Sequence, residues 1–455
     1  MKTYHSIYIA ACAALLSSCG IYTTYHPATE VPEQLYGEGC VFSESSSIAS
    51  LHWRELFTDP YLVTLIEQGL ANNTDYLAAG LRVQEAEATL LSAKLAYLPS
   101  LALAPQGTLS HLEGHKMTKA YSLPATASWE IDLFGKLRNA KRQSQALLAQ
   151  SKDYQQAVRS QLIAGIANSY YTLLMLDAQL RIAEQTATSW GESARATHAL
   201  MQAGMTNEAA VAQMEAAYAQ VSASVLDQKD QINQVENSLS LLLTETPHRV
   251  QRGTLAGQTW PASLSVGFPV SLLANRPDVR AAERSLEQAF YATNQARAAF
   301  YPSITLSGNA GWTNSAGGMI SNPAQFVASA VGSLTQPLFA KGQLTGQLKI
   351  AKARQEEASL QFQQTLLQAG AEVNEALVQY QTAQEKRELY AEQVNALQTA
   401  YRSTSLLMEH GTTTYLEVLT AQQSLLSAQL TQVANEVTEI QSLIQLYQAL
   451  GGGAE

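Results

Sequence analysis

The side chains best suited to chemistry are few, and none forms a recognisable catalytic set. His111 and His115 lie four residues apart, the helical spacing of metal ligands, but Gly114 and the flanking strand patterns place them in a loop. Met201 and Met205 have the same spacing. Thioether sulfur binds soft metal ions, yet a Met pair near a helix end is also ordinary packing. Phosphate-binding Gly-x-x-x-x-Gly-Lys loops, Gly-x-Ser-x-Gly elbows and Cys-x-x-Cys pairs do not occur. We therefore expect no enzymatic activity and no metal site.

The N-terminus predicts export followed by lipid anchoring. Lys2 precedes an apolar run at residues 7–16, which fits a signal peptide and is too short for a transmembrane helix. The run ends in Leu16-Ser17-Ser18-Cys19, which resembles a bacterial lipobox, and Gly20 implies sorting to the outer membrane. We expect removal of 1–18, a covalent lipid on Cys19 with no other cofactor, and an extended anchored segment at 19–57. The alternative is an ordinary secretory signal that happens to contain a Cys. Cys40 has no assigned role.

The composition argues against two broad classes of protein. A formal net charge of −10 over 455 residues offers no basic surface for nucleic acid. Only 15% of the residues are charged, compared with about 25% in ordinary soluble domains. No run of about 18 apolar residues predicts a membrane-spanning helix. The low charge content therefore needs another explanation.

Three sequence landmarks occur twice, in the same order and at nearly the same spacing. The matching pairs are Ala93-Lys94-Leu95-Ala96-Tyr97-Leu98-Pro99-Ser100 with Ala296-Arg297-Ala298-Ala299-Phe300-Tyr301-Pro302-Ser303, Leu133-Phe134-Gly135-Lys136 with Leu338-Phe339-Ala340-Lys341, and Leu200-Met201-Gln202-Ala203-Gly204 with Leu407-Met408-Glu409-His410-Gly411. Such self-similarity is typical of an internal repeat. We expect a tandem duplication with repeats at 58–250 and 276–450, a linker at 251–275 and a tail at 451–455.

Each repeat is predicted to contain a helix, two strands, a very long helix and a returning helix. The first helices span 61–97 and 278–300 and are each followed by a proline. The long helices span 136–203 and 341–410. Small or apolar residues recur in the first of them at alternating steps of three and four, as in a coiled coil. Gly204 and Gly411 then mark the turns into returning helices at 207–243 and 414–450.

The predicted strands, 101–112, 122–133, 303–314 and 326–338, explain the low charge content. Charged residues are absent from 95–112 and from 298–340. Apolar and polar residues alternate in 123–133 and in 304–313, and Trp129 and Trp312 belong to the apolar faces. Aromatic residues flank these segments, as at a membrane interface. We predict transmembrane β-strands in which Trp129 and Trp312 face lipid. A soluble hairpin packed on helices is the alternative.

The number of strands predicts an assembly. Four strands in one chain cannot close a barrel, and an open strand edge is unstable in lipid. Two chains supply eight strands with a filled interior, whereas three chains supply twelve and leave a lumen. We therefore expect a mixed, mainly α fold class: a 12-stranded transmembrane β-barrel in a trimer, continued by a long α-helical coiled-coil barrel.

Several motifs together resemble one known family. They are Asn275-Arg276-Pro277-Asp278-Val279-Arg280-Ala281-Ala282-Glu283, Phe300-Tyr301-Pro302-Ser303-Ile304, Trp129-Glu130-Ile131-Asp132-Leu133-Phe134-Gly135-Lys136 and the ending Ala449-Leu450-Gly451-Gly452-Gly453. The chain is similar to TolC-like outer-membrane factors, the outer membrane efflux proteins, in their lipid-anchored OprM/NodT branch. The resemblance implies a homotrimer in the cell outer membrane whose helical part lies in the periplasm. It also implies a periplasmic adaptor (membrane fusion protein) and an inner-membrane pump of the resistance-nodulation-division class.

The implied function is a passive exit duct of a tripartite efflux system that conducts small toxic compounds or drugs. The alternatives are the outer-membrane component of a metal-ion efflux or type I protein secretion system, and a lipid-anchored periplasmic spacer. The family motif is expected to be structural, because a proline in the first turn followed by an acid is typical of a helix start. Its residues are Arg276, Pro277, Asp278, Arg280 and Glu283. Asn275 departs from the family, which often has Arg there.

The periplasmic gate is expected at the turn after the second long helix, around 408–420, with Met408 and Gly411 at the turn itself. By resemblance, the constriction in the family carries acidic rings just beyond this Gly. Glu417 matches one acidic position, and Thr420 occupies the position of the second. The resemblance therefore implies a single acidic ring. The alternative is that Glu417 is an ordinary solvated helix residue.

Overall fold

The computed structural model describes residues 24–26, 51–111, 113–114, 117–258, 276–316 and 319–453, with only the backbone at 316 and 319–322. The chain divides into two compact units. We call the first the sheet unit, which comprises Met1–Glu30, Arg82–Lys152 and Ala281–Gln364, and the second the helical unit, which comprises Val31–Leu81, Asp153–Arg280 and Thr365–Glu455. The predicted signal peptide, Cys19 and Cys40 lie outside the described residues, as does most of the expected linker 251–275.

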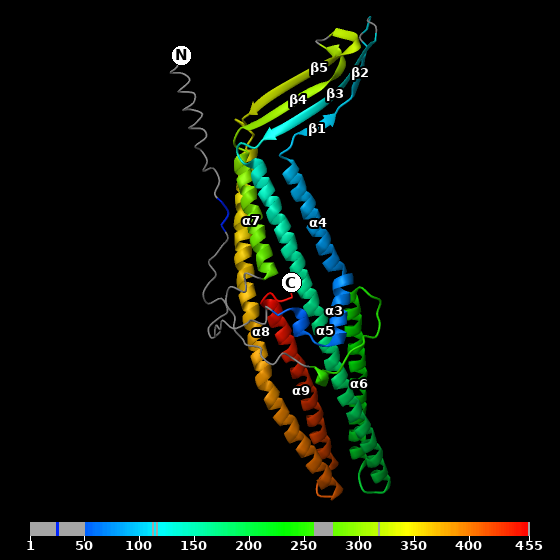
Figure 1. The fold of residues 1–455 in the computed structure, drawn as a ribbon. Coiled ribbons are helices and arrows are strands. Elements are labelled where there is room, and N and C mark those ends of the chain that lie inside the picture. Colours follow the sequence, from blue (N-terminus) through cyan, green and yellow to red (C-terminus); the bar gives the residue numbers. More distant parts are fainter. Residues whose placement is uncertain are drawn as a thin grey trace. The chain divides into compact units, whose positions relative to one another are not determined.

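The long helices are confirmed (Figure 1). Helices α5 (Lys136–Gln202) and α8 (Gln343–Glu409) contain 67 residues each, which corresponds to about 100 Å of helix. The returning helices are α6 (Glu208–Leu243) and α9 (Tyr415–Ala449), and α7 (Pro277–Ala298) precedes the second pair of strands. Within the described ranges, no helix has both the length and the hydropathy needed to cross a membrane.

The prediction of one helix over 61–97 is wrong, because the helix breaks at Asn73 into α3 (Pro60–Asn72) and α4 (Thr74–Leu95). The Asn73 backbone N–H donates to the carbonyl of Gly69 at 2.8 Å and ends α3. Its side-chain Oδ1 accepts from the Tyr76 N–H at 2.9 Å and caps the first turn of α4. Its Nδ2 also donates to the carbonyl of Leu242 at 2.9 Å, so this buried amide ties α3 and α4 to the end of α6.

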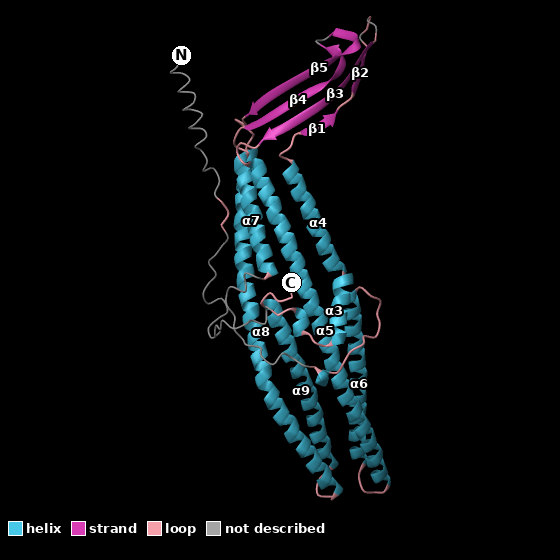
Figure 2. Ribbon diagram, in the orientation of Figure 1, coloured by secondary structure: helices cyan, strands magenta, loops and turns pink. Residues whose placement is uncertain are grey.

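The strands form one antiparallel sheet (Figure 2). The order is β1 (Ser100–Leu103), β3 (Thr118–Ile131), β4 (Ser303–Ala316) and β5 (Met319–Thr335), and β2 (Gln106–Ser110) also pairs with β3. The central β3–β4 pair joins strands from the two predicted repeats. Trp129 pairs with Leu306, and Leu123 pairs with Trp312.

The prediction of a continuous strand over 101–112 is wrong, because the strand is interrupted between β1 and β2. Pro105 has no N–H to donate to the ladder. The preceding Ala104 N–H donates to the carbonyl of Pro124 at 3.0 Å, after which pairing resumes between Gln106 and Ser122. The first strand therefore pairs with β3 as two short pieces.

All four boundaries of the strands predicted at 122–133 and 326–338 differ. The strand β3 starts earlier, at Thr118, where it pairs with Ser110 of β2. The strand β3 ends at Ile131 because Asp132 turns to capping: its carboxylate accepts from the N–H groups of Leu137 and Arg138 at 3.1 and 2.8 Å, at the start of α5. The strand β5 starts at Met319 because it pairs directly with Ala316 in a short hairpin. It ends at Thr335, before Pro337, which has no N–H. The prediction 303–314 for β4 agrees closely.

The core of the helical unit also contains parts of two segments that were predicted to lie outside the repeats, the extended segment 19–57 and the tail 451–455. Helix α2 (Trp53–Leu56) lies within the segment 19–57 predicted to be extended. Its Trp53 and Leu56 are buried, which stabilises a helical turn there. At the other end, the predicted tail 451–455 is packed as far as residue 453. The Ser160 hydroxyl donates to the carbonyl of Gly452 at 2.6 Å, and the Tyr447 hydroxyl donates to the carbonyl of Leu51 at 2.9 Å.

Candidate gate and membrane-facing elements

The turn between α8 and α9 has the geometry predicted for it. Gly411 has φ +69°, and its N–H donates to the carbonyl of Met408 at 2.9 Å, while the Thr412 N–H donates to Leu407 at 2.9 Å. These two bonds satisfy carbonyls at the end of α8 and reverse the chain. The turn between α5 and α6 repeats the pattern, with Gly204 at φ +73°. Met408 and Gly411 therefore lie at the reversal itself.

Glu417 and Thr420 lie on the first two turns of α9, and both are exposed. The Thr413 hydroxyl donates to the Glu417 carboxylate, and the Glu417 N–H donates to the carbonyl of Thr414 at 3.2 Å. The Thr420 hydroxyl donates to the carbonyl of Leu416 at 2.8 Å. A carboxylate in the first turn also interacts favourably with the helix dipole. The structure thus gives Glu417 a local capping contact and leaves its charge accessible to solvent.

A contact that the sequence analysis missed joins α9 to the α5–α6 hairpin. The Tyr415 hydroxyl donates to Gln213 Oε1 on α6, and Gln422 Nε2 donates to the Ser189 hydroxyl on α5 at 3.3 Å. Leu419 completes an apolar cluster with residues of α5 and α6: Trp190, Ala194, Met214, Ala217 and Val221. Tyr415 and Gln213 belong to no motif, so their pairing depends on the folded arrangement of the two hairpins.

The sheet pairing places the predicted apolar residues on one face. Residues paired across an antiparallel ladder share a face. The pairs Trp129–Leu306 and Leu123–Trp312 therefore belong to the same face, and Ser128 and Thr313 belong to the other. Trp129 is 40% and Trp312 is 56% exposed, so both indoles lie on the surface of the single chain.

Aromatic residues from both repeats meet where the helices join the sheet. The rings of Phe134 and Tyr301 stack at 5.1 Å. The Trp129 indole N–H donates to the carbonyl of Tyr97 at 2.8 Å. Phe339 is 86% exposed close to the start of α8. An exposed aromatic cluster beside an apolar sheet face has the composition of a membrane-interface belt.

The family motif, residues 275–283, lies at the start of α7, and its Arg276 contacts the end of α9. The Arg276 guanidinium is buried, donates to both carboxylate oxygens of Asp278 at 3.0 and 2.6 Å, and donates to Glu372 at 2.7 Å. It also donates to the carbonyl of Ala449 at 3.0 Å, at the end of α9. Burial disfavours both charges, but the hydrogen bonds outweigh it, so the pKa of Arg276 is raised and the pKa of Asp278 is lowered.

The remaining motif residues agree with a structural role. Pro277 occupies the first position of α7, where its missing N–H is harmless. Arg280 forms an ion pair with the buried carboxylate of Asp153 on α5. Glu283 follows on α7, where its carboxylate contributes to the raised pKa of Tyr25. The motif therefore positions helices in this chain.

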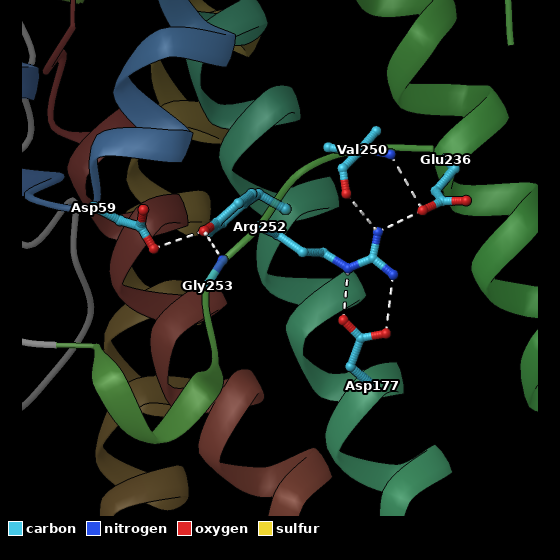
Figure 3. Close-up of polar contacts among 7 residues, drawn as sticks. Asp59, Asp177, Glu236, Val250, Arg252 and Gly253 are labelled. Carbon is cyan, nitrogen blue, oxygen red and sulfur yellow. Dashed lines mark hydrogen bonds and ion pairs between the residues drawn. The ribbon is translucent and has the colours of Figure 1, made fainter. Parts of the chain in front are cut away.

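A second buried polar network was not predicted (Figure 3). The Arg252 guanidinium donates to Asp177 at 2.6 and 2.9 Å, to Glu236 at 2.5 Å and to the carbonyl of Val250 at 3.0 Å. The bonds to Asp177 and Glu236 raise the pKa of Arg252 despite its burial. These contacts fix the start of the expected linker against α5 and α6.

Tyr170 and Asp59 also bind the segment that follows Arg252, at Gly253 and Gln258. The Tyr170 hydroxyl donates to Asp59 at 2.6 Å and accepts from the Gly253 N–H at 3.1 Å. Gln258 Nε2 also donates to Asp59, at 2.7 Å. Every charged or polar group of this network has a partner, as in a structural joint rather than a binding site.

Within the described residues, the His and Met side chains considered as metal ligands do not come together in a metal site. No group of three or more His, Cys, Asp or Glu residues able to hold a metal is present there. His111 is exposed at the end of β2, and His115 lies outside the described residues. Met201 lies in the last turn of α5, and Met205 is 75% exposed in the turn that follows this helix.

Comparison with known proteins gives a consistent result. The family model of the outer membrane efflux proteins matches residues 65–245 and 268–452. The Escherichia coli cation efflux system protein CusC is 29% identical over 448 residues, which cover 97% of each chain. The Pseudomonas putida probable efflux pump outer membrane protein TtgC is 27% identical over 459 residues, covering 98% of this chain and 95% of its own. The solved outer-membrane channel OprN superposes with a TM-score of 0.84 at 27% identity, covering 95% of this chain and 98% of its own.

Proposed function

Because the chain belongs to the outer membrane efflux protein family, we propose that it is the outer-membrane exit duct of a tripartite efflux system. The observation that carries this function is the combination within one chain of an antiparallel sheet with an exposed apolar face and helices of 67 residues. The sheet has the character of a membrane-embedded element, and the helices are long enough to line a tunnel of about 100 Å. A passive conduit needs no catalytic set.

Three chains are needed to complete the duct. In the described residues of one chain, β5 pairs only with β4, and β1 and β2 pair only with β3, so both sheet edges carry unpaired backbone groups. Such edges are unstable in lipid unless another chain pairs with them. Helix α8 also exposes apolar side chains that a neighbouring chain would cover: Ile350, Leu360, Leu367 and Leu389. These features support a homotrimer with a 12-stranded barrel and a helical tunnel.

The internal duplication explains how one chain supplies this geometry. Before its strands, the first half has the helices α3 and α4 and the second half has α7. Each half then contributes strands, a 67-residue helix and a returning helix, and the two glycine turns have matching hydrogen bonds. Six similar helical hairpins in a trimer would surround one axis. Their turns form the natural contact region for a periplasmic adaptor, which in turn connects to an inner-membrane pump of the resistance-nodulation-division class.

The pathway is tested by deleting the chain from its own host and measuring the accumulation of exported dyes and the sensitivity to toxic compounds. We expect increased accumulation that the wild-type chain reverses. Cross-linked pull-down from the same cells should recover one adaptor and one inner-membrane pump. Unchanged accumulation together with recovery of neither partner would contradict the proposed function.

A second cargo class, soft metal ions, is favoured by one feature of the turns. Met205 is 75% exposed in the turn between α5 and α6, and Met408 and His410 are exposed at the equivalent turn after α8. Thioether and imidazole groups are ligands for Cu(I) and related ions. Sensitivity of the deletion strain to copper or silver, but not to drugs, would identify metal ions as the cargo.

Lipid anchoring of Cys19 gives the first prediction. Replacing Cys19 with Ala should abolish incorporation of labelled fatty acid and slow processing of the signal peptide. Export should be only partly lost, because the sheet supplies membrane affinity independently of the lipid. Cys40→Ala is the matched control and should keep the label. Undiminished labelling of the Cys19→Ala chain would refute the assignment.

The two faces of the sheet give the second prediction. Trp129→Arg or Trp312→Arg should impair membrane assembly by about 2–4 kcal/mol near the bilayer midplane, and by less near an interface. Ser128→Arg and Thr313→Arg are the matched controls on the other face of the sheet. They should be tolerated, since that face would border the lumen of the proposed barrel. Assembly is measured as the fraction of heat-modifiable trimer. Equal effects on the two faces would exclude this orientation of the sheet.

The gate gives the third prediction. Three Glu417 carboxylates around a narrow axis should favour cations. Glu417→Ala should therefore reduce cation selectivity and block by divalent cations in planar-bilayer recordings, while trimer assembly is retained. Thr413→Ala removes the hydroxyl contact but keeps the charge, so it should retain selectivity. Unaltered selectivity and block in Glu417→Ala would show that Glu417 does not form the gate ring.

A further inference from the structure

A pocket unrelated to the predicted duct lies within the sheet unit. It has a volume of about 470 Å³, is open to solvent, and is lined by the short segment at residues 24–26 and by helices α7 and α8. The residues that matter for its chemistry are Tyr25, His26, Phe290, Arg297, Lys352 and Glu356. The family motif and the gate contribute no residue to it. Its composition combines an apolar side with a cationic side.

The cationic side consists of Arg297 and Lys352. Neither forms an ion pair with a described residue. Arg297 Nη1 donates to Asn294 Oδ1 at 3.2 Å, which leaves most of the N–H groups of its guanidinium available. Glu356 is the acid among the described lining residues, so two permanent cations face one carboxylate.

The apolar side is formed where the N-terminal segment packs on α7. The ring of Tyr25 contacts the ring of Phe290 edge-on, with centroids 5.6 Å apart. The Tyr25 hydroxyl oxygen is buried and has no hydrogen-bond partner among the described residues. Burial and the carboxylates of Glu283 and Glu287 raise the pKa of Tyr25 to about 12, so the phenol is neutral at physiological pH. This contact fixes Tyr25 on α7 and closes one side of the pocket.

The position of the pocket along the helices matches the headgroup level of a membrane. Arg297 precedes the last residue of α7, and β4 begins at Ser303. The Thr293 hydroxyl donates to the carbonyl of Ala351 at 3.2 Å, so Lys352 of α8 lies beside the last two turns of α7. The exposed aromatics Phe300, Tyr301 and Phe339 lie between this level and the sheet. Cations just beyond an aromatic belt face lipid headgroups.

The sequence places the predicted lipid anchor nearby. Cys19 is six residues before Tyr25, so an extended chain brings it within about 20 Å of the pocket. This distance does not depend on whether Cys19 is acylated. The segment at 24–26 itself lies beside α7 and α8.

We propose that this pocket binds a phosphate group between Arg297 and Lys352, with the apolar side formed by Tyr25 and Phe290 covering the remainder of the ligand. A phospholipid of the inner leaflet of the outer membrane presents such a group at this level. Guanidinium and ammonium groups form charge-assisted hydrogen bonds with phosphate oxygens. Inorganic phosphate presents the same chemistry from solution, and the experiment separates the two sources.

The test uses the full-length chain, purified in detergent and stripped of lipid. Phosphatidylglycerol and phosphatidylethanolamine are titrated separately and followed by native mass spectrometry. A parallel titration uses inorganic phosphate. The variant R297Q/K352Q removes both cations, and K349Q/R354Q is the matched control, because it removes two exposed cations of α8 that do not line the pocket.

The wild-type chain and K349Q/R354Q should bind one phospholipid per chain with equal affinity, and R297Q/K352Q should bind at least about tenfold more weakly. Binding of inorganic phosphate alone, with the same dependence on the two cations, would assign the site to a soluble anion. The single variant Lys352→Gln, at an exposed position, keeps the test valid if the double variant assembles poorly, and it too should bind more weakly. Equal binding by the wild-type chain and both pocket variants would overturn the proposal.

Discussion

Replacing Gly311 with Ala should prevent the two halves of the sheet from pairing. Gly311 of β4 lies opposite Pro124 of β3. A Cβ atom at residue 311 would lie 2.1 Å from the carbonyl oxygen of Leu123 and 2.6 Å from Pro124 Cα. Both are backbone atoms, so a side-chain rotation cannot relieve the overlap. We expect a loss of about 3 kcal/mol or more, at or above the upper end for overpacking.

The measurement is the fraction of heat-modifiable trimer in isolated outer membranes. Gly107→Ala in β2 is the matched control, since a Cβ there would meet nothing within 4 Å. Gly308→Ala should be intermediate, because the nearest atom to its Cβ would be the carbonyl oxygen of Ser329 at 3.2 Å. Wild-type amounts of trimer from Gly311→Ala would show that β3 and β4 do not pair as described.

Replacing Arg252 with Met should destabilise the helical unit by about 3–5 kcal/mol, the range for breaking one side of a buried ion pair. The side chains of Arg252 and Glu236 are 9% and 10% exposed. The substitution therefore leaves the Glu236 carboxylate buried without its cationic partner. It also removes two bonds to Asp177. Unfolding in guanidinium chloride, followed by far-UV circular dichroism, measures the loss.

Two further variants distinguish the cost of leaving a buried charge unpaired from the cost of losing an ion pair. Lys229→Met breaks the exposed ion pair between Lys229 on α6 and Glu184 on α5. The loss of unfolding free energy should be below about 1 kcal/mol, because exposed ion pairs contribute little to stability. Adding Glu236→Gln to Arg252→Met should recover part of the stability, because the buried group becomes neutral and its oxygen still accepts from the Val250 N–H. A similar cost for Lys229→Met and Arg252→Met would contradict a special role for the buried network.

The sequence predicted those features that depend on local patterns. Alternating residues in 123–133 and 304–313 predicted the sheet faces, and the glycine turns at Gly204 and Gly411 follow from the need for positive φ at helix ends. The boundaries were missed where one side chain changes the backbone path. Asn73 splits a helix, Pro105 interrupts a strand, and Asp132 ends β3 by capping α5.

Long-range pairing was not predictable from the same patterns. Arg252 lies in a segment that reads as a linker, and its partners Asp177 and Glu236 lie on two different helices. Tyr415 and Gln213 are likewise distant in sequence and belong to no motif. The gate residues Glu417 and Thr420 were located by resemblance, and the structure places them on the first turns of α9 without testing their role.

The trimeric duct is tested most directly by the mass of the assembled protein. The chain is extracted from outer membranes in a mild detergent, and native mass spectrometry determines how many copies each particle contains. The proposed function predicts three copies, because three chains close a barrel with a lumen. A particle of two chains would have a filled interior, and a single chain would leave both sheet edges open, so either result would contradict an exit duct.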